Sequence, residues 1–145
     1  MSRTHLVALA IVLALSGGQA LADDLAGANR FLCAAVQATD CPESGACTVD
    51  LPWNLNVPEF IEIDLDAMRL ATTKASGQNR ETTIEHLSRR DGTIVIQGFE
   101  KGRAFSWVIT ESTGRLAAAI AAEGRAVAVF GACTPLVAPA GPGGK

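Results

Sequence analysis

The sequence offers few of the residues that common enzymes use. It contains no tyrosine, and of its two histidines only His86 follows residue 22. A general base needs a partner nearby, but Glu85 and His86 are neighbours, and neighbours in a β-strand point to opposite faces. No Gly-x-Ser-x-Gly segment marks a nucleophilic serine. The sequence therefore predicts a protein that is not an enzyme.

Motifs for metals and cofactors are also absent. A single histidine after residue 22, together with cysteines that lack Cys-x-x-Cys spacing, does not supply a zinc or redox site. Glu62 and Asp64 form a carboxylate pair, but two residues apart in a strand they share one face, which we expect to be solvated. No calcium loop, phosphate loop or dinucleotide-binding segment occurs. We expect no metal and no cofactor.

Basic residues are outnumbered by acidic ones. The chain has 12 Lys and Arg against 15 Asp and Glu, a net charge of −3. Removing residues 1–22 would take away only Arg3, leaving 11 against 15 and a charge of −4. Nucleic-acid binding rests on clustered Lys and Arg, and Arg89-Arg90 is only a pair. We expect a monomer without a nucleic-acid partner.

The chain begins with a single long apolar run, over residues 6–15, that follows Arg3 and His5. Residues 16–19 break the run, and Ala20 and Ala22 supply the small side chains that signal peptidase requires. A membrane-spanning helix needs roughly 20 apolar residues, which no segment provides. The sequence predicts a signal peptide over residues 1–22, cleavage after Ala22, a periplasmic or secreted protein, and no membrane insertion of the mature chain.

Four cysteines follow the predicted signal peptide. An even number of cysteines in an exported chain predicts disulfides, because the compartment is oxidising. Four cysteines allow three pairings, of which we favour one. Cys41–Cys47 would close a short loop of turn-forming residues, and Cys33–Cys133 would tie the first strand to the last.

Glycine turns divide the second half of the chain regularly. The glycines of four turn dipeptides are spaced by 10, 12 and 10 residues, and runs of strand length separate them. Short strands at this spacing predict an antiparallel meander, because parallel strands need longer crossovers. The dipeptides are Asp91-Gly92, Lys101-Gly102, Thr113-Gly114 and Glu123-Gly124.

The first half adds further strands. We expect them over residues 31–39, 47–50, 60–65, 68–72 and 82–89, which makes eight or nine short strands in total. Because a long meander has two exposed edges, we predict an all-β, disulfide-stapled, up-and-down barrel that is either closed or strongly curled. The predicted domain covers residues 23–136, and a Pro- and Gly-rich tail, residues 137–145, is expected to be disordered.

Two segments are ambiguous. Residues 116–122 are mostly alanine, the best helix former, but they lie between two glycine turns and fit the meander. We therefore predict a strand over residues 115–123. Residues 24–29 are expected to form a helical turn or to be disordered.

Aromatic residues supply the candidate binding sites. Phe105, Trp107 and Ile109 share one face of a strand, which either forms the core or lines a pocket for an apolar ligand. Trp53 and Leu55 lie in an extended loop between two prolines. This loop either closes an open barrel end or presents Trp53 to a partner.

Three segments resemble small exported proteobacterial proteins of unassigned function. They are Phe31-Leu32-Cys33, the strand from Gly102 to Trp107, and the ending from Phe130 to Pro135. The resemblance implies a bacterial periplasm and transfers no catalytic residue. Periplasmic inhibitors of C-type lysozyme are similar in expected architecture, but their Ser-Gly-x-x-Tyr signature is missing.

Two functions follow as expectations. The first is a non-enzymatic periplasmic protein that binds a small apolar ligand or an envelope component. The alternative is a protein-interaction or inhibitor module that uses the Trp53 loop to bind an envelope protein.

Overall fold

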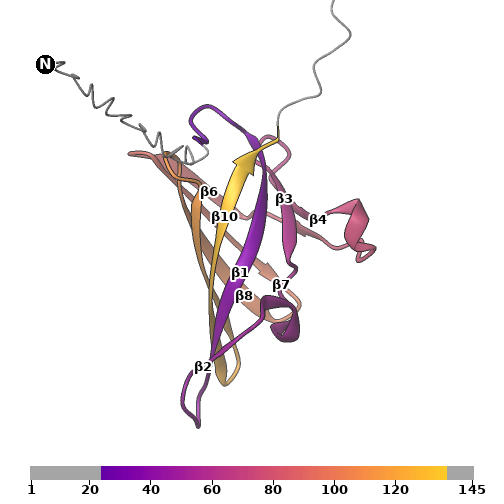
Figure 1. Cartoon of the computed structure of the whole chain (residues 1–145), viewed down its shortest axis with the longest axis vertical. Coiled ribbons are helices and arrows are strands. Elements are labelled where there is room, and N and C mark those ends of the chain that lie inside the picture. The colour runs from indigo at the N-terminus through magenta and orange to yellow at the C-terminus, as the bar shows by residue number, and fades with distance from the viewer. Residues whose placement is uncertain (1–23, 137–145) are drawn as a thin grey trace, which may run out of the picture.

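The computed structural model describes residues 24–136, which form one antiparallel sheet of ten strands (Figure 1). The predicted signal peptide, residues 1–22, and the predicted tail, residues 137–145, lie outside the described residues. The strands are β1 (Arg30–Pro42), β2 (Thr48–Asp50), β3 (Phe60–Asp64), β4 (Arg69–Thr72), β5 (Glu81–Thr83), β6 (His86–Arg90), β7 (Thr93–Glu100), β8 (Arg103–Thr110), β9 (Arg115–Ala122) and β10 (Arg125–Pro135), and the 3-10 turns are η1 (Pro52–Leu55) and η2 (Lys74–Ser76).

The strand order is β5-β4-β3-β1-β10-β9-β8-β7-β6, with β2 paired to β1. The first and last strands are therefore neighbours near the middle of the sheet, and Cys33 pairs with Cys133 across them. The two free edges, β5 and β6, follow each other in the chain. The sheet curls through 283° into a half-barrel. This confirms the predicted all-β meander in its strongly curled form.

Two of the four glycine turns are tight two-residue hairpin turns. Asp91 and Gly92 have φ of 52° and 70°, and Lys101 and Gly102 have φ of 47° and 81°. Two successive positive φ angles define a type I′ turn, whose twist matches that of the flanking strands. These turns fix the register of β7 with β6 and with β8.

The alanine-rich segment is a strand, as predicted. Along β9, Leu116 and Ala118 are buried while Ala117 and Ala119 are exposed. This alternation has the two-residue period of a strand. Pairing with β8 and β10 on either side outweighs the helix propensity of alanine.

The segment expected to be a single strand, residues 82–89, is divided into β5 and β6. Ile84 N–H donates to the Met68 carbonyl at 2.8 Å, and Glu85 N–H donates to the Gln97 carbonyl at 2.9 Å. The chain thus leaves β4 and joins β7 within two residues. Ile84 is buried, which anchors the point where the chain passes from edge strand β5 to edge strand β6.

Residues 24–29 close one end of the half-barrel, which corrects the expectation of a helical turn or disorder. Leu25 is fully buried in the core, and its N–H donates to the Glu111 carbonyl at 2.8 Å. The Arg89 guanidinium donates to the Leu25 and Ala28 carbonyls, each at 3.0 Å. Buried Leu25 and the Arg89 guanidinium therefore hold residues 24–29 across this end of the half-barrel. We call it the closed end.

Both favoured disulfides, Cys33–Cys133 and Cys41–Cys47, are present. Two disulfides and no free cysteine indicate an oxidising environment outside the cytoplasm. Within residues 24–136, no helix is long and apolar enough to cross a membrane.

Candidate functional site

Phe105 and Trp107 lie on the inner face of β8, where the sequence places them. Trp107 is buried and Phe105 is half-buried, and their ring centroids are 6.3 Å apart in an edge-to-face arrangement. Gly98 pairs with Phe105 across β7 and β8. A Cβ at Gly98 would lie 2.6 Å from the Phe105 ring, so the glycine lets this ring lie over the β7 backbone.

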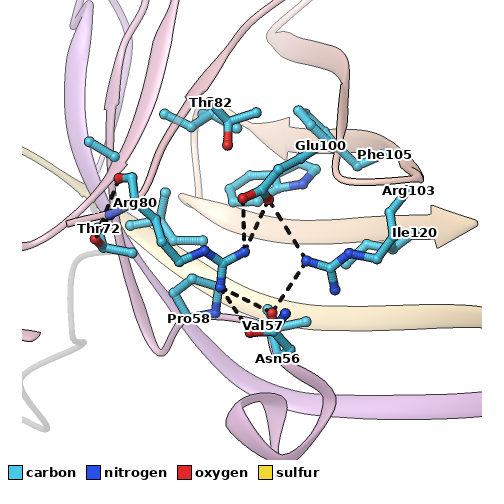
Figure 2. Close-up of a pocket in the computed structure, with 14 residues that line it drawn as sticks. Asn56, Val57, Pro58, Thr72, Arg80, Thr82, Glu100, Arg103, Phe105 and Ile120 are labelled. Carbon is cyan, nitrogen blue, oxygen red and sulfur yellow. Dashed lines mark hydrogen bonds and ion pairs between the residues drawn. The ribbon is translucent and has the colours of Figure 1, made fainter. Parts of the chain in front are cut away.

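A cavity of about 60 Å³ opens beside these two rings, away from the closed end. Its wall is mainly apolar, and polar groups gather at its mouth (Figure 2). We call it the mouth pocket. The wall includes the apolar residues Val57, Ile61, Leu70, Phe105, Trp107 and Ile120. The mouth includes the polar residues Asn56, Thr82, Arg80, Glu100 and Arg103.

Unequal strand lengths explain why this end is open. β3, β4 and β5 have 5, 4 and 3 residues, whereas β7, β8 and β9 have 8 each. The short strands end before the long ones, so the wall is incomplete on one side. The loop after η1 covers part of the gap with buried Val57.

Deeper in the half-barrel the packing is nearly complete. A second space, lined in part by Trp107 and Ile120, has a volume of about 10 Å³. This is about the volume of one water-sized sphere. Large buried side chains such as Phe31, Ile63 and Ile96 fill the rest of the core. The interior described by residues 24–136 is therefore packed, with usable room only at the mouth.

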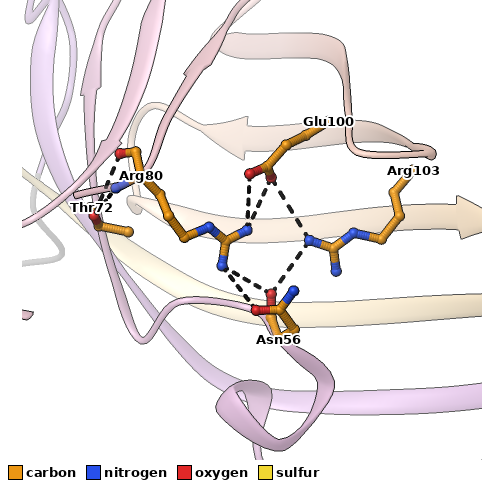
Figure 3. Close-up of polar contacts among 5 residues, drawn as sticks. All are labelled: Asn56, Thr72, Arg80, Glu100 and Arg103. Atoms are coloured by element: carbon orange, nitrogen blue, oxygen red, sulfur yellow. Dashed lines mark hydrogen bonds and ion pairs between the residues drawn. The ribbon is translucent and has the colours of Figure 1, made fainter. Parts of the chain in front are cut away.

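Arg80 and Glu100 form the fixed part of the mouth (Figure 3). One Arg80 nitrogen donates to both Glu100 carboxylate oxygens, at 3.2 and 3.0 Å. The other terminal nitrogen donates to the backbone and side-chain oxygens of Asn56, at 3.2 and 3.3 Å. The Arg80 backbone is itself held, because its N–H donates to the Thr72 hydroxyl at 2.9 Å.

Arg103 approaches the same two partners more loosely. Its Nη2 lies 3.8 Å from Glu100 Oε2 and donates to the Asn56 carbonyl at 3.4 Å. Glu100 and Arg103 are opposite each other at the start of the β7–β8 hairpin, so the type I′ turn brings them together. Figure 3 shows both guanidinium groups facing the one carboxylate.

The loop expected to be extended between Pro52 and Pro58 begins instead with the 3-10 turn η1, which separates Trp53 from Leu55. Leu55 packs against the core, while Trp53 is 48% exposed. Neither lines the mouth pocket, although Asn56, Val57 and Pro58, which follow them, do. Of the four predicted binding residues, the pocket therefore brings together only Phe105 and Trp107.

The remaining candidates lie elsewhere. His86 is exposed at the start of β6, and neither it nor Glu85 lines the mouth pocket. Glu62 and Asp64 are half-buried on β3, and Asp64 pairs with Arg30 at 3.3 Å. Among residues 24–136, no three or more His, Cys, Asp or Glu side chains gather where they could hold a metal ion.

Sequence reasoning missed the charged mouth. Glu100 and Arg103 could have been found, because two residues that flank a two-residue hairpin turn lie opposite each other. Arg80 and Asn56 come from loops 24 residues apart, and no local pattern joins them.

No protein-family model matches the chain, and neither the curated proteins nor the solved structures yielded a significant match. The function must therefore be inferred from the geometry of the mouth pocket.

Proposed function

We propose that this is a binding protein of the bacterial periplasm that holds the small apolar end of a ligand in the mouth pocket. The observation that carries the proposal is the pocket itself, with an aromatic and aliphatic wall and a few polar groups at its opening. Ligand sites are typically concave, mostly apolar, and oriented by a small number of polar groups. The predicted signal peptide and the two disulfides support the compartment.

The volume limits what can enter. An apolar cavity of about 150 Å³ can hold benzene, and the mouth pocket has about 60 Å³. It therefore has room for an apolar end of about two to four carbon atoms, with the rest of the ligand outside. This excludes a long lipid chain as the bound group and narrows the expected ligand to a small molecule with a short apolar end.

The groups at the mouth favour binding over catalysis. Glu100 is the one carboxylate among the lining residues, and Arg80 holds it through two hydrogen bonds. Both oxygens of this carboxylate are therefore already hydrogen-bonded within the protein. The site is thus suited to orient a ligand rather than to transform it.

A neutral probe tests the proposal. We expect 4-methylpentanamide to bind with millimolar affinity, because so few atoms are buried. In NMR titrations its binding should shift the indole N–H of Trp107 and the methyl groups of Ile61 and Ile120, which line the pocket.

A matched pair of variants locates the binding. Thr82 lines the pocket and Thr83 is exposed on the same short strand, so Thr82→Phe should abolish the shifts and Thr83→Phe should keep them. Equal binding by both variants, or no shifts in the wild-type protein, would overturn the proposal.

Exposure of Trp53 favours a second candidate, a protein-binding module. Leu51, just before η1, and Trp53, within η1, are 46% and 48% exposed, and aromatic anchors often dominate protein interfaces. We expect Trp53→Ala to weaken capture of an envelope protein from periplasmic extract while leaving binding of the amide intact. If Trp53→Ala captures the same proteins as wild type, this second candidate fails.

A further inference from the structure

The mouth of the pocket carries an excess positive charge. Two arginines and one glutamate are the charged residues among its lining, which leaves a net charge of +1. The whole chain has the opposite sign, with a net charge of −3. General composition therefore does not explain this local excess.

The two arginines differ in how many hydrogen bonds they already donate within the protein. Four hydrogen bonds, all between 3.0 and 3.3 Å, occupy the two terminal nitrogens of Arg80. A guanidinium has five N–H donors, but the described residues accept only one hydrogen bond from the Arg103 side chain, at 3.4 Å. Arg103 thus keeps donors for a group from outside the protein.

The Arg103 guanidinium also lies at the mouth before any ligand binds. Its side chain is 22% exposed, and it begins β8 directly after the type I′ turn formed by Lys101 and Gly102. Figure 2 shows its guanidinium at the mouth, with Phe105 and Ile120 nearby. A charged group that already lies at the mouth needs no large movement to meet a ligand.

We propose that Arg103 binds a carboxylate of the ligand whose apolar end fills the mouth pocket. This inference rests on the proposed function and names its ligand class: small carboxylic acids with a short apolar end. A guanidinium matches a carboxylate through two parallel hydrogen bonds. A single negative charge also balances the net +1 of the mouth, whereas a dianion would leave the mouth with a net charge of −1.

A pair of probes that differ only in charge tests this inference. On the wild-type protein, 4-methylpentanoate should bind roughly tenfold more tightly than 4-methylpentanamide, since hydrogen bonds between charged groups are the stronger ones. The Trp107 indole N–H reports both titrations by NMR.

Two variants assign the preference to Arg103. Arg103→Gln should bring the ratio of the two affinities close to one, with signal dispersion in the same spectra showing that the variant is folded. Lys101→Gln removes the same charge from the neighbouring turn outside the pocket lining and should keep the tenfold ratio.

The outcomes separate the two proposals. Equal binding of acid and amide to the wild-type protein, or loss of the preference in Lys101→Gln as well, would overturn the role of Arg103 and leave the mouth pocket as an apolar site. If neither probe binds, the proposed function fails and the inference fails with it.

Discussion

At the scale of single residues, an ion pair joins the long strands β1 and β10 far from the closed end. Arg125 at the start of β10 donates to both carboxylate oxygens of Asp40 on β1, at 2.5 and 2.7 Å. These hydrogen bonds hold the pKa of Asp40 below its ordinary value of 3.8. The hydrogen bonds to Asp40 also raise the pKa of Arg125. Both shifts show that the folded protein favours the charged forms.

The direction of the shift predicts how stability depends on pH. A carboxylate whose pKa is lowered on folding stabilises the fold above its unfolded pKa, and that stabilisation is lost as the pH falls through the folded pKa. We therefore expect Asp40→Asn to unfold at lower urea concentration than wild type at about pH 7, and we expect this difference to shrink at about pH 2.

Glu123→Gln is the matched control for Asp40→Asn. Glu123 is exposed in the turn before β10 and forms no ion pair with any residue between 24 and 136, so its urea midpoint should follow wild type at both pH values. A midpoint difference for Asp40→Asn that persists unchanged in acid would contradict the ion-pair explanation.

At the scale of the elements, the pairing of β1 with β10 contains a bulge. The register shifts between Ala35 and Gln37, and Gly131 lies opposite Ala35. A Cβ at Gly131 would lie 2.1 Å from the Ala34 carbonyl oxygen. The bulge therefore depends on a glycine in the opposite strand.

Gly131→Ala should be one of the most damaging single substitutions in the sheet. The added methyl group meets backbone rather than a flexible side chain, so two central strands must separate. Overpacking of this kind costs about 3 kcal/mol or more, which urea denaturation would detect.

Gly45→Ala serves as the comparison. Gly45 is exposed, and its added Cβ would meet only the Pro42 ring at 3.2 Å, so we expect a change within about 0.5 kcal/mol. If both variants unfold at the same urea concentration, the close approach at Gly131 does not govern the stability of the sheet.

The elements also show how far the sequence could predict this fold. Turn dipeptides such as Lys101-Gly102 predict the hairpins from β6 to β10, because tight turns need positive φ at these positions. The bulge opposite Gly131 could not be predicted, since it depends on a contact between strands far apart in the chain. The division at Ile84 could not be predicted for the same reason, since the change of partner from β4 to β7 depends on contacts with other strands.

The candidate site was predictable in its apolar part and in the pairing of Glu100 with Arg103 across the hairpin turn. Alternation places Phe105 and Trp107 on one face, and that face proved to be the inner one. Arg80 looks like an ordinary solvated residue in a polar loop, and only the folded chain brings it to Glu100. Polar sites assembled from separate loops leave no periodic signal in a single sequence.

At the scale of the whole molecule, the two disulfides should contribute unequally. Cys33 and Cys133 are 100 residues apart, and Cys41 and Cys47 are 6 apart. In the chain-entropy model, a 100-residue loop is worth about 4.7 kcal/mol and a loop of six residues about 2. The long-range bridge is also buried in the core, so its loss leaves a cavity.

We therefore expect Cys33→Ala/Cys133→Ala to lose more free energy of unfolding than Cys41→Ala/Cys47→Ala, by about 2 to 3 kcal/mol. Guanidinium denaturation of the two double variants without reductant measures the difference. Equal losses, or the reverse order, would contradict the loop-length explanation.

The adjacency of β1 and β10 has a practical consequence for anyone who handles the protein. Leu136 N–H donates to the Arg30 carbonyl at 2.9 Å, so the chain enters and leaves the sheet at one place, on the closed end (Figure 1). The mouth pocket opens away from that place. A tag or sensor-chip linker attached next to residue 24 or residue 136 would leave the mouth pocket turned toward solution. Joining residue 24 to residue 136 would give a circular chain, which could then be opened at another turn.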